Sequence, residues 1–391
     1  MHDHDDAANL KPATRLIRSG RNPELTGPFV NPPVVHASTV LFEDVAAMRP
    51  GGQRYVYGRR GTPTSEALED ALADLEGAAG VVLCPSGLSA VATALMSVLS
   101  AGDHLLVADN VYGPGRHAAT GVLARFGVEA TFFDPMDLDA LPGLFTARTR
   151  AVYVESPGSL TFEMTDILRV VAIAHAHGAK VVADNTWATP LLYRPLDAGV
   201  DLAVVAGTKY LAGHSDVMIG TVAANAETWN ALHATHEELG LCVGPDDIYL
   251  TLRGLRTMAV RLPRHEETAL KLARHLTARP EVERVLYPAL PEDPGHALWQ
   301  RDMSGASGLF GVVMRGWSAA RTTAFLNALR LFGLGYSWGG FESLAIPAGL
   351  QRSVMAPPPP AALIRLHAGL EDAEDLIADL DQAFAVAAAT A

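Results

Sequence analysis

Short apolar runs alternate with longer amphipathic segments through the middle of the chain. The runs are dense in Val, Leu and Ala and cover residues 80–84, 104–108, 151–155, 180–184 and 202–206. Short apolar runs separated by helix-sized segments are typical of strands buried in a parallel sheet. The alternation therefore predicts an α/β fold with a mostly parallel sheet and helices on both of its faces.

The pattern changes at both ends of this region. The first part of the chain is rich in Pro, Asn, Gly and Thr with weak periodicity, which predicts an extended arm that packs on the rest of the chain or on a neighbouring subunit. Past Gly254 the alternation loosens, and we expect helices near residues 266–276, 319–331 and 372–386. The predicted organisation is an N-terminal arm (1–58), a large α/β domain (59–254) and a smaller C-terminal α+β domain (255–391).

Composition and charge exclude several classes of protein. With 49% hydrophobic and 19% charged residues the chain is ordinarily globular. A net charge of −13 argues against nucleic acid or an anionic membrane as a partner. The acidic start of the chain lacks the features of a signal peptide, and no apolar window approaches the length of a membrane span. Cys84 and Cys242 suit a reducing compartment and form no metal motif. We expect a cytoplasmic protein without a metal site.

Lys209 is the most informative single residue. The chain otherwise uses arginine, the other lysines being Lys11, Lys180 and Lys271. Lys209 follows the apolar run at 202–206, and Asp184 ends the preceding run at 180–184. In an open α/β sheet, ligands bind beyond the carboxyl ends of the strands. An amine and a carboxylate at that edge are what a pyridoxal phosphate enzyme needs, as a Schiff-base lysine and a partner for the pyridinium nitrogen.

Other residues at strand ends fit the same cofactor. The segment after the run at 80–84 turns through Gly87 and Leu88 into a helix, which offers free backbone N–H groups to a single phosphate. The hydroxyl of Thr208 could reach a phosphate oxygen, and Tyr112 follows the run at 104–108, where an aromatic ring could stack on a flat cofactor. Each feature alone also fits a structural role: a helix cap, a turn or a core tyrosine.

Two further segments carry cations. Tyr57 and Arg59 lie two residues apart, so an extended segment would present both to one phosphate. Arg365 lies inside the apolar run Leu363–Leu366. A buried arginine needs an anionic partner, and the bidentate guanidinium suits the α-carboxylate of a substrate.

Together these residues resemble the Cys/Met metabolism family of pyridoxal phosphate enzymes, over essentially the whole chain. The resemblance rests on Tyr57–Thr62, Glu155–Ser159, Asp184–Ala188, Thr208–Asp216, Arg253–Thr257 and Ile364–Glu371. It implies the fold-type-I architecture and pyridoxal 5′-phosphate held by Lys209, with Asp184 at the ring nitrogen and Tyr112 stacked on the ring. Gly87, Leu88 and Thr208 would bind the phosphate, joined by Tyr57 and Arg59 of a neighbouring subunit in a homotetramer built from dimers.

Within that family, the block at 336–343 is similar to the cystathionine β-lyases, which share Tyr336 and Trp338. The resemblance implies β-elimination of L-cystathionine, with Arg365, Ser337 and Trp338 holding the α-carboxylate and Lys209 or Tyr112 handling protons. Two departures from the family pattern are Ala206, where many relatives have a serine, and Glu237, where some β-lyases have a tyrosine. A γ-lyase, an O-acylhomoserine sulfhydrylase, a side activity as an alanine racemase and a non-catalytic binding protein remain alternatives.

Overall fold

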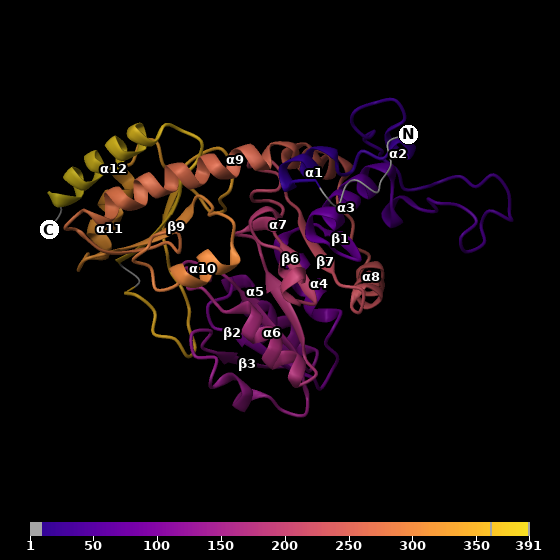
Figure 1. Ribbon diagram of the computed structural model, residues 1–391, viewed down its shortest axis with the longest axis horizontal. Coiled ribbons are helices and arrows are strands. Elements are labelled where there is room, and N and C mark those ends of the chain that lie inside the picture. Colours follow the sequence, from indigo (N-terminus) through magenta and orange to yellow (C-terminus); the bar gives the residue numbers. More distant parts are fainter. Residues whose placement is uncertain (1–9, 360–361, 390–391) are drawn as a thin grey trace.

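The structure is a computed structural model that describes residues 10–359 and 362–389. Two β-sheets with their covering helices lie side by side, and one long helix runs along both (Figure 1). Within the described residues, none of the helices is long and apolar enough to span a lipid bilayer.

The larger sheet has seven strands in the order β1-β7-β6-β5-β4-β2-β3. The neighbours from β6 to β3 pair in parallel, whereas β7 runs antiparallel to both β1 and β6. The strands are β1 (Gly80–Cys84), β2 (His104–Ala108), β3 (Glu129–Phe133), β4 (Thr149–Glu155), β5 (Lys180–Asp184), β6 (Leu202–Val205) and β7 (Gly220–Ala224). The predicted α/β class with a mostly parallel sheet is confirmed.

Helices cover both faces of this sheet because each strand buries side chains in two directions. Val82 packs in one apolar core and its neighbour Leu83 in the other, as expected when successive side chains of a strand point to opposite faces. The helices of this part of the chain are α3 (Pro63–Glu76), α4 (Gly87–Met96), α5 (Gly113–His117), α6 (Ile167–Ala176), α7 (Thr189–Leu192) and α8 (Trp229–Glu238). The antiparallel strand β7 has no counterpart in the predicted pattern.

The smaller sheet has five strands in the order β10-β11-β12-β9-β8, and only β10 and β11 pair in parallel. The strands are β8 (Val282–Leu286), β9 (Leu309–Met314), β10 (Gly333–Leu334), β11 (Leu344–Pro347) and β12 (Leu363–His367). Its helices are α10 (His296–Asp302), α11 (Ala319–Ala328) and α12 (Ala373–Ala388). Helices α11 and α12 lie close to the predicted ranges.

The long helix α9 (Pro245–Thr277) joins the two halves (Figure 1). It extends well beyond the predicted segment 266–276, and the domain boundary predicted after residue 254 falls inside it. Pro263 is accommodated within this helix. Leu255 packs in the core of the larger sheet and Leu272 in that of the smaller sheet, so burial at both ends outweighs the local cost of the proline.

The N-terminal arm is only partly extended, and its residues 1–9 lie outside the described part of the chain. Two short helices, α1 (Pro12–Arg18) and α2 (Pro23–Thr26), anchor it through Leu16 and Leu25 in the core beside α3. The following segment projects from the rest of the chain (Figure 1). It leaves apolar side chains in solvent, among them Phe29, Leu41 and Val45.

Candidate active site

The carboxyl ends of β4, β5 and β6 carry the charged residues of the candidate site. Glu155 ends β4 and lies opposite Asp184, which ends β5 in the same register. The chain leaving β6 passes through Ala206 to Lys209. Asp184 and Lys209 come close enough that the charge of each acts on the pKa of the other. This is the juxtaposition that the rule for parallel sheets predicts from the sequence.

Lys209 is a largely buried amine. Its Nζ donates to the Ser337 hydroxyl at 2.5 Å and lies 5.4 Å from the centre of the Trp338 ring. Burial, and then the positive charge of Arg365, lower the pKa of Lys209 to about 8, although the carboxylate of Asp184 acts in the opposite direction. A substantial fraction of the amine is therefore neutral near physiological pH, as a nucleophile or base requires.

Asp184 is held rigidly in the sheet. Thr186 donates to its Oδ1 from both the backbone N, at 2.9 Å, and the hydroxyl, at 2.5 Å. The Thr186 hydroxyl in turn accepts from Ala206 N at 2.9 Å, which links β5 to the segment leading to Lys209. Burial raises the pKa of Asp184. A protonated nitrogen placed against the remaining oxygen would offset that desolvation, so the site fits a pyridinium ring.

Arg365 lies on β12 and is buried without a carboxylate partner among the described residues. Its Nη2 donates to the backbone oxygens of Ser337, at 2.8 Å, and Gly335, at 3.2 Å, and its Nε has no acceptor. Burial lowers the pKa of Arg365 to about 10. The anionic partner predicted for this arginine is thus not supplied by the described part of the chain, which leaves the guanidinium to an incoming anion.

Tyr112 is half-exposed, and its backbone is bonded to Glu155. Its N–H donates to Glu155 Oε2 at 2.6 Å. Burial, and then the carboxylates of Asp184 and Glu155, raise the pKa of Tyr112. The phenol therefore stays protonated at neutral pH and can act as an acid.

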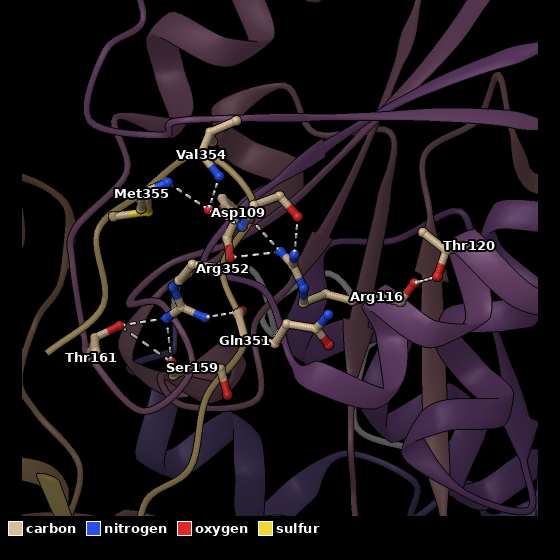
Figure 2. Close-up of polar contacts among 10 residues, drawn as sticks. Asp109, Arg116, Thr120, Ser159, Thr161, Gln351, Arg352, Val354 and Met355 are labelled. Atoms are coloured by element: carbon tan, nitrogen blue, oxygen red, sulfur yellow. Dashed lines mark hydrogen bonds and ion pairs between the residues drawn. The ribbon is translucent and has the colours of Figure 1, made fainter. Parts of the chain in front are cut away.

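The segment just before Tyr112 is tied to the smaller sheet by a connection from β11 towards β12 (Figure 2). The fully buried carboxylate of Asp109 accepts from the backbone N–H groups of Ser353, Val354 and Met355 at 2.8–2.9 Å. It also pairs with Arg116 at 2.7 Å. Residues 351–355, which we call the strap, thus hold the end of β2 and with it the approach to Tyr112.

Arg352 adds a second attachment of the strap. Its guanidinium donates to Ser159 O at 3.1 Å and to the Thr161 hydroxyl at 2.6 Å (Figure 2). Both acceptors lie on the chain leaving β4. The strap therefore spans the carboxyl ends of β2 and β4.

Two of the predicted phosphate-binding residues, Gly87 and Leu88, lie at the start of α4. Ser86 caps this helix by accepting from Ser89 N at 3.1 Å, and Gly87 and Leu88 form its first turn. A Cβ added to Gly87 would lie 2.5 Å from the Cβ of Ala206, so a side chain at Gly87 would collide there. Thr208 Oγ1 accepts from Ile219 N at 3.0 Å and donates to Ile219 O at 3.1 Å, so its hydroxyl is bonded to the residue that directly precedes β7.

Tyr57 and Arg59 lie elsewhere on the same chain. Arg59 Nη1 donates to the backbone oxygen of Glu237, on α8, at 3.1 Å, and Arg60 faces the Glu237 carboxylate at 3.4 Å. No contact of either residue with Lys209 occurs within the described part of the chain. Glu237 therefore contacts Arg59 and Arg60 in this chain, and Tyr57 stays half-exposed.

Sequence reasoning gave no role to Glu155, Asp109 or His367. Glu155 and Asp109 end or directly follow strands of the larger sheet, so the rule that selected Asp184 could have found them. His367 lies two residues after Arg365, on the same face of β12. Of the predicted substrate-binding residues, Tyr336 is 89% exposed and Ser337 adopts a φ of +69°.

Comparisons with known proteins agree with this geometry. The model of the family described as Cys/Met metabolism PLP-dependent enzyme matches residues 13–385. A Rhizobium johnstonii protein with the provisional name cystathionine β-lyase is 52% identical over 381 residues, covering 96% of each chain. The cystathionine β-lyase of Bordetella avium is 45% identical over 373 residues, covering 93% of each.

Solved structures support the same assignment. The crystal structure of a cystathionine γ-synthase from Xanthomonas oryzae pv. oryzae, in complex with aminoacrylate and cysteine, superimposes with a TM-score of 0.90. It is 35% identical and covers 98% of this chain and 100% of its own. The family match indicates pyridoxal phosphate as the cofactor, and a helix N-terminus, a buried carboxylate and a lysine of lowered pKa suit that group. The chain belongs to the Cys/Met metabolism family of pyridoxal phosphate-dependent enzymes.

Proposed function

We propose that the protein is a carbon–sulfur lyase that cleaves L-cystathionine by β-elimination, giving homocysteine, pyruvate and ammonia. The observation that carries the proposal is the environment of the Lys209 amine, which donates to Ser337 in the block that resembles the β-lyases and whose pKa responds to the charges of Arg365 and Asp184. The β-lyase names of two relatives add support.

The binding roles follow from the contacts. Arg365 would hold the α-carboxylate of the substrate, together with the backbone of Ser337 and Trp338, because its charge has no carboxylate partner among the described residues. Asp184 would hold the ring nitrogen, and the α4 N-terminus with Thr208 the phosphate. When bound, pyridoxal phosphate supplies an electron sink for the carbanion formed at Cα.

Proton transfer falls to two residues. Lys209, whose pKa of about 8 leaves much of it neutral, would take the proton from Cα. Tyr112 stays protonated because burial raises its pKa, and it or the protonated Lys209 would donate to the departing sulfur. Homocysteine leaves as the thiol, and water converts the remaining three carbons into pyruvate and ammonia.

A second copy of the chain completes the proposed site. Arg59 lies against Glu237 in its own chain, so Tyr57 and Arg59 would serve the phosphate site of a neighbour. The arm supports such an assembly because Leu41, which is 85% exposed, and Val45 present apolar surface to solvent. We infer a homotetramer of dimers, and the free thiols Cys84 and Cys242 fit a cytoplasmic location.

The test measures pyruvate and 2-oxobutyrate released from L-cystathionine by the purified holoenzyme. Pyruvate from the wild type and from Lys271→Ala, but not from Lys209→Ala, is the expected result; Lys271 is a half-exposed lysine on α9 that pairs with Glu267. Dominant 2-oxobutyrate would instead identify a γ-lyase. Turnover only with added sulfide and an acylated homoserine would identify a sulfhydrylase. An active Lys209→Ala variant would show that the function does not depend on Lys209 and would favour a non-catalytic binding protein.

A further inference from the structure

His367 ends β12 and is 0% exposed. Because side chains two residues apart on a strand share a face, it lies on the same side of the sheet as Arg365. It packs against Tyr210 and His265, with ring centres 6.0 and 5.3 Å away. Nothing in the proposed chemistry uses this imidazole, although the charges of Arg365 and Lys209 both act on its pKa.

Both ring nitrogens of His367 are bonded to one turn of the chain. Nε2 lies 3.1 Å from the backbone N of Gly339, and Nδ1 lies 3.1 Å from the backbone oxygen of Glu342. A backbone N–H can only donate and a carbonyl can only accept. Nε2 must therefore be unprotonated and Nδ1 must carry the proton, so a single neutral tautomer satisfies both contacts.

The turn held in this way controls the residues that face Lys209. A Cβ added to Gly339, whose φ is +87°, would lie 3.0 Å from the backbone carbon of Lys209. Two residues earlier, Ser337 adopts a φ of +69°, a left-handed conformation that is strained for a residue other than glycine. In this conformation its hydroxyl accepts from Lys209 Nζ at 2.5 Å and its carbonyl accepts from Arg365 at 2.8 Å.

We propose that His367 is a positioning residue that clamps the turn Gly339–Glu342 and thereby keeps Ser337 in its strained conformation between Lys209 and Arg365. The inference rests on the proposed function only for the substrate used in its kinetic test. Other contacts hold the far end of the same segment, since Ser343 bonds the Glu371 carboxylate at 2.7 and 2.8 Å. Within the part of the chain that the structure describes, His367 alone bonds the N–H of Gly339.

The surroundings of His367 keep its imidazole neutral. Burial, and then the charges of His265, Arg365 and Lys209, hold the pKa of His367 well below its usual value, while its bond to Glu342 opposes this. A protonated ring would turn Nε2 into a donor facing the Gly339 donor. The imidazole of His367 is accordingly expected to stay neutral at a pH at which an ordinary histidine takes up a proton.

The test compares His367→Leu, which removes both bonds at similar volume, with His367→Gln, whose amide offers one donor and one acceptor. His265→Leu is the matched control, since His265 packs in the same cluster but bonds Ala368 O and not the turn. Hydrogen exchange of the peptide containing residues 335–343 is followed in the cofactor-free protein. We expect about tenfold faster exchange at Gly339 in His367→Leu, near wild-type exchange in His367→Gln, and no change there in His265→Leu.

Steady-state kinetics then test whether His367 acts through Ser337. We expect kcat/KM for L-cystathionine to fall about tenfold in His367→Leu and to recover largely in His367→Gln. In a Ser337→Ala background, His367→Leu should have little further effect, because the group that it positions is gone. Fully additive losses, or wild-type exchange at Gly339 in His367→Leu, would overturn the proposal. If the wild type releases no pyruvate, the proposed function fails, but the exchange experiment still decides the role of His367.

Discussion

The lowered pKa of the Lys209 amine is the property on which the proposed chemistry depends most directly. The structure attributes its low pKa first to burial and second to Arg365, with Asp184 acting against them. Two substitutions should therefore move this pKa in opposite directions. Arg365→Leu removes a cation and should raise the pKa of Lys209, whereas Asp184→Asn removes an anion and should lower it further.

The preference of Lys209 for its neutral form follows from the size of its pKa shift. A fall from 10.5 to about 8 corresponds to roughly 3 kcal/mol of preference for the neutral amine. At pH 7.5 about a quarter of the amine is then neutral, against about one in a thousand for an unperturbed lysine. Since burial remains in Arg365→Leu, we expect its pKa to rise by on the order of half a unit to one unit.

Stability should follow the same shift in the cofactor-free protein. The folded pKa of Lys209 lies below the unfolded value, so the unfolded chain binds more protons between about pH 8 and 10.5. Lys209 therefore lowers the free energy of unfolding by its full amount below about pH 8, and this loss disappears as the pH rises from about 8 to 10.5. Lys209→Met should remove this part of the pH dependence.

Competitive labelling of the cofactor-free protein with trace acetic anhydride measures the pKa directly. The peptide containing Lys209 is quantified by mass spectrometry across the pH range, and the peptides with Lys180 and Lys271 report the reagent in the same samples. A labelling midpoint near 8 is expected for the wild type. A midpoint at 10 or above, or shifts of the same sign in both variants, would refute the electrostatic reasoning.

Three further perturbations test the surroundings of the site. Asp109→Asn breaks a buried ion pair and weakens the acceptor of the strap amides, so it should lower the free energy of unfolding by about 3 kcal/mol. It should also speed hydrogen exchange at residues 351–355. Denaturant unfolding and hydrogen exchange that match the wild type would contradict this. Burial, and then Asp184, raise the pKa of Glu155 well above its usual value. Glu155→Gln should therefore change the free energy of unfolding by less than about 1 kcal/mol, whereas Glu155→Ala should lower it by about 1–3 kcal/mol because the bond from Tyr112 N is lost. Equal losses in the two variants would count against a protonated Glu155. Gly339→Ala places a Cβ against the backbone of Lys209 at a positive φ, so it should lower the free energy of unfolding by about 1–3 kcal/mol and also reduce activity. Thermal unfolding and pyruvate release measure the two effects. An unchanged variant would show that the turn is not tightly packed.

Much of the architecture could be read from local pattern. The runs ending at Asp184 and preceding Lys209 are short and apolar on both faces, which is typical of buried parallel strands, and the carboxyl-end rule then predicted that the two residues lie together. The long helix α9 was foreseen only in part. Gly254 and Pro263 weaken its local signal, and burial against two separate cores decides its length.

The amino-acid sequence by itself determined the sheet class, the lysine and aspartate at its edge, and the family, because these depend on periodicity and on motifs along the chain. Only the tertiary structure decided which groups surround Lys209. Ser337 bonds Lys209 across 128 residues of sequence, Arg365 and His367 bond the segment that contains Ser337, and the strap bonds Asp109 across 244 to 246 residues. Such contacts are set by how the two sheets pack, and the pKa of a buried group depends on that packing rather than on its neighbours in sequence.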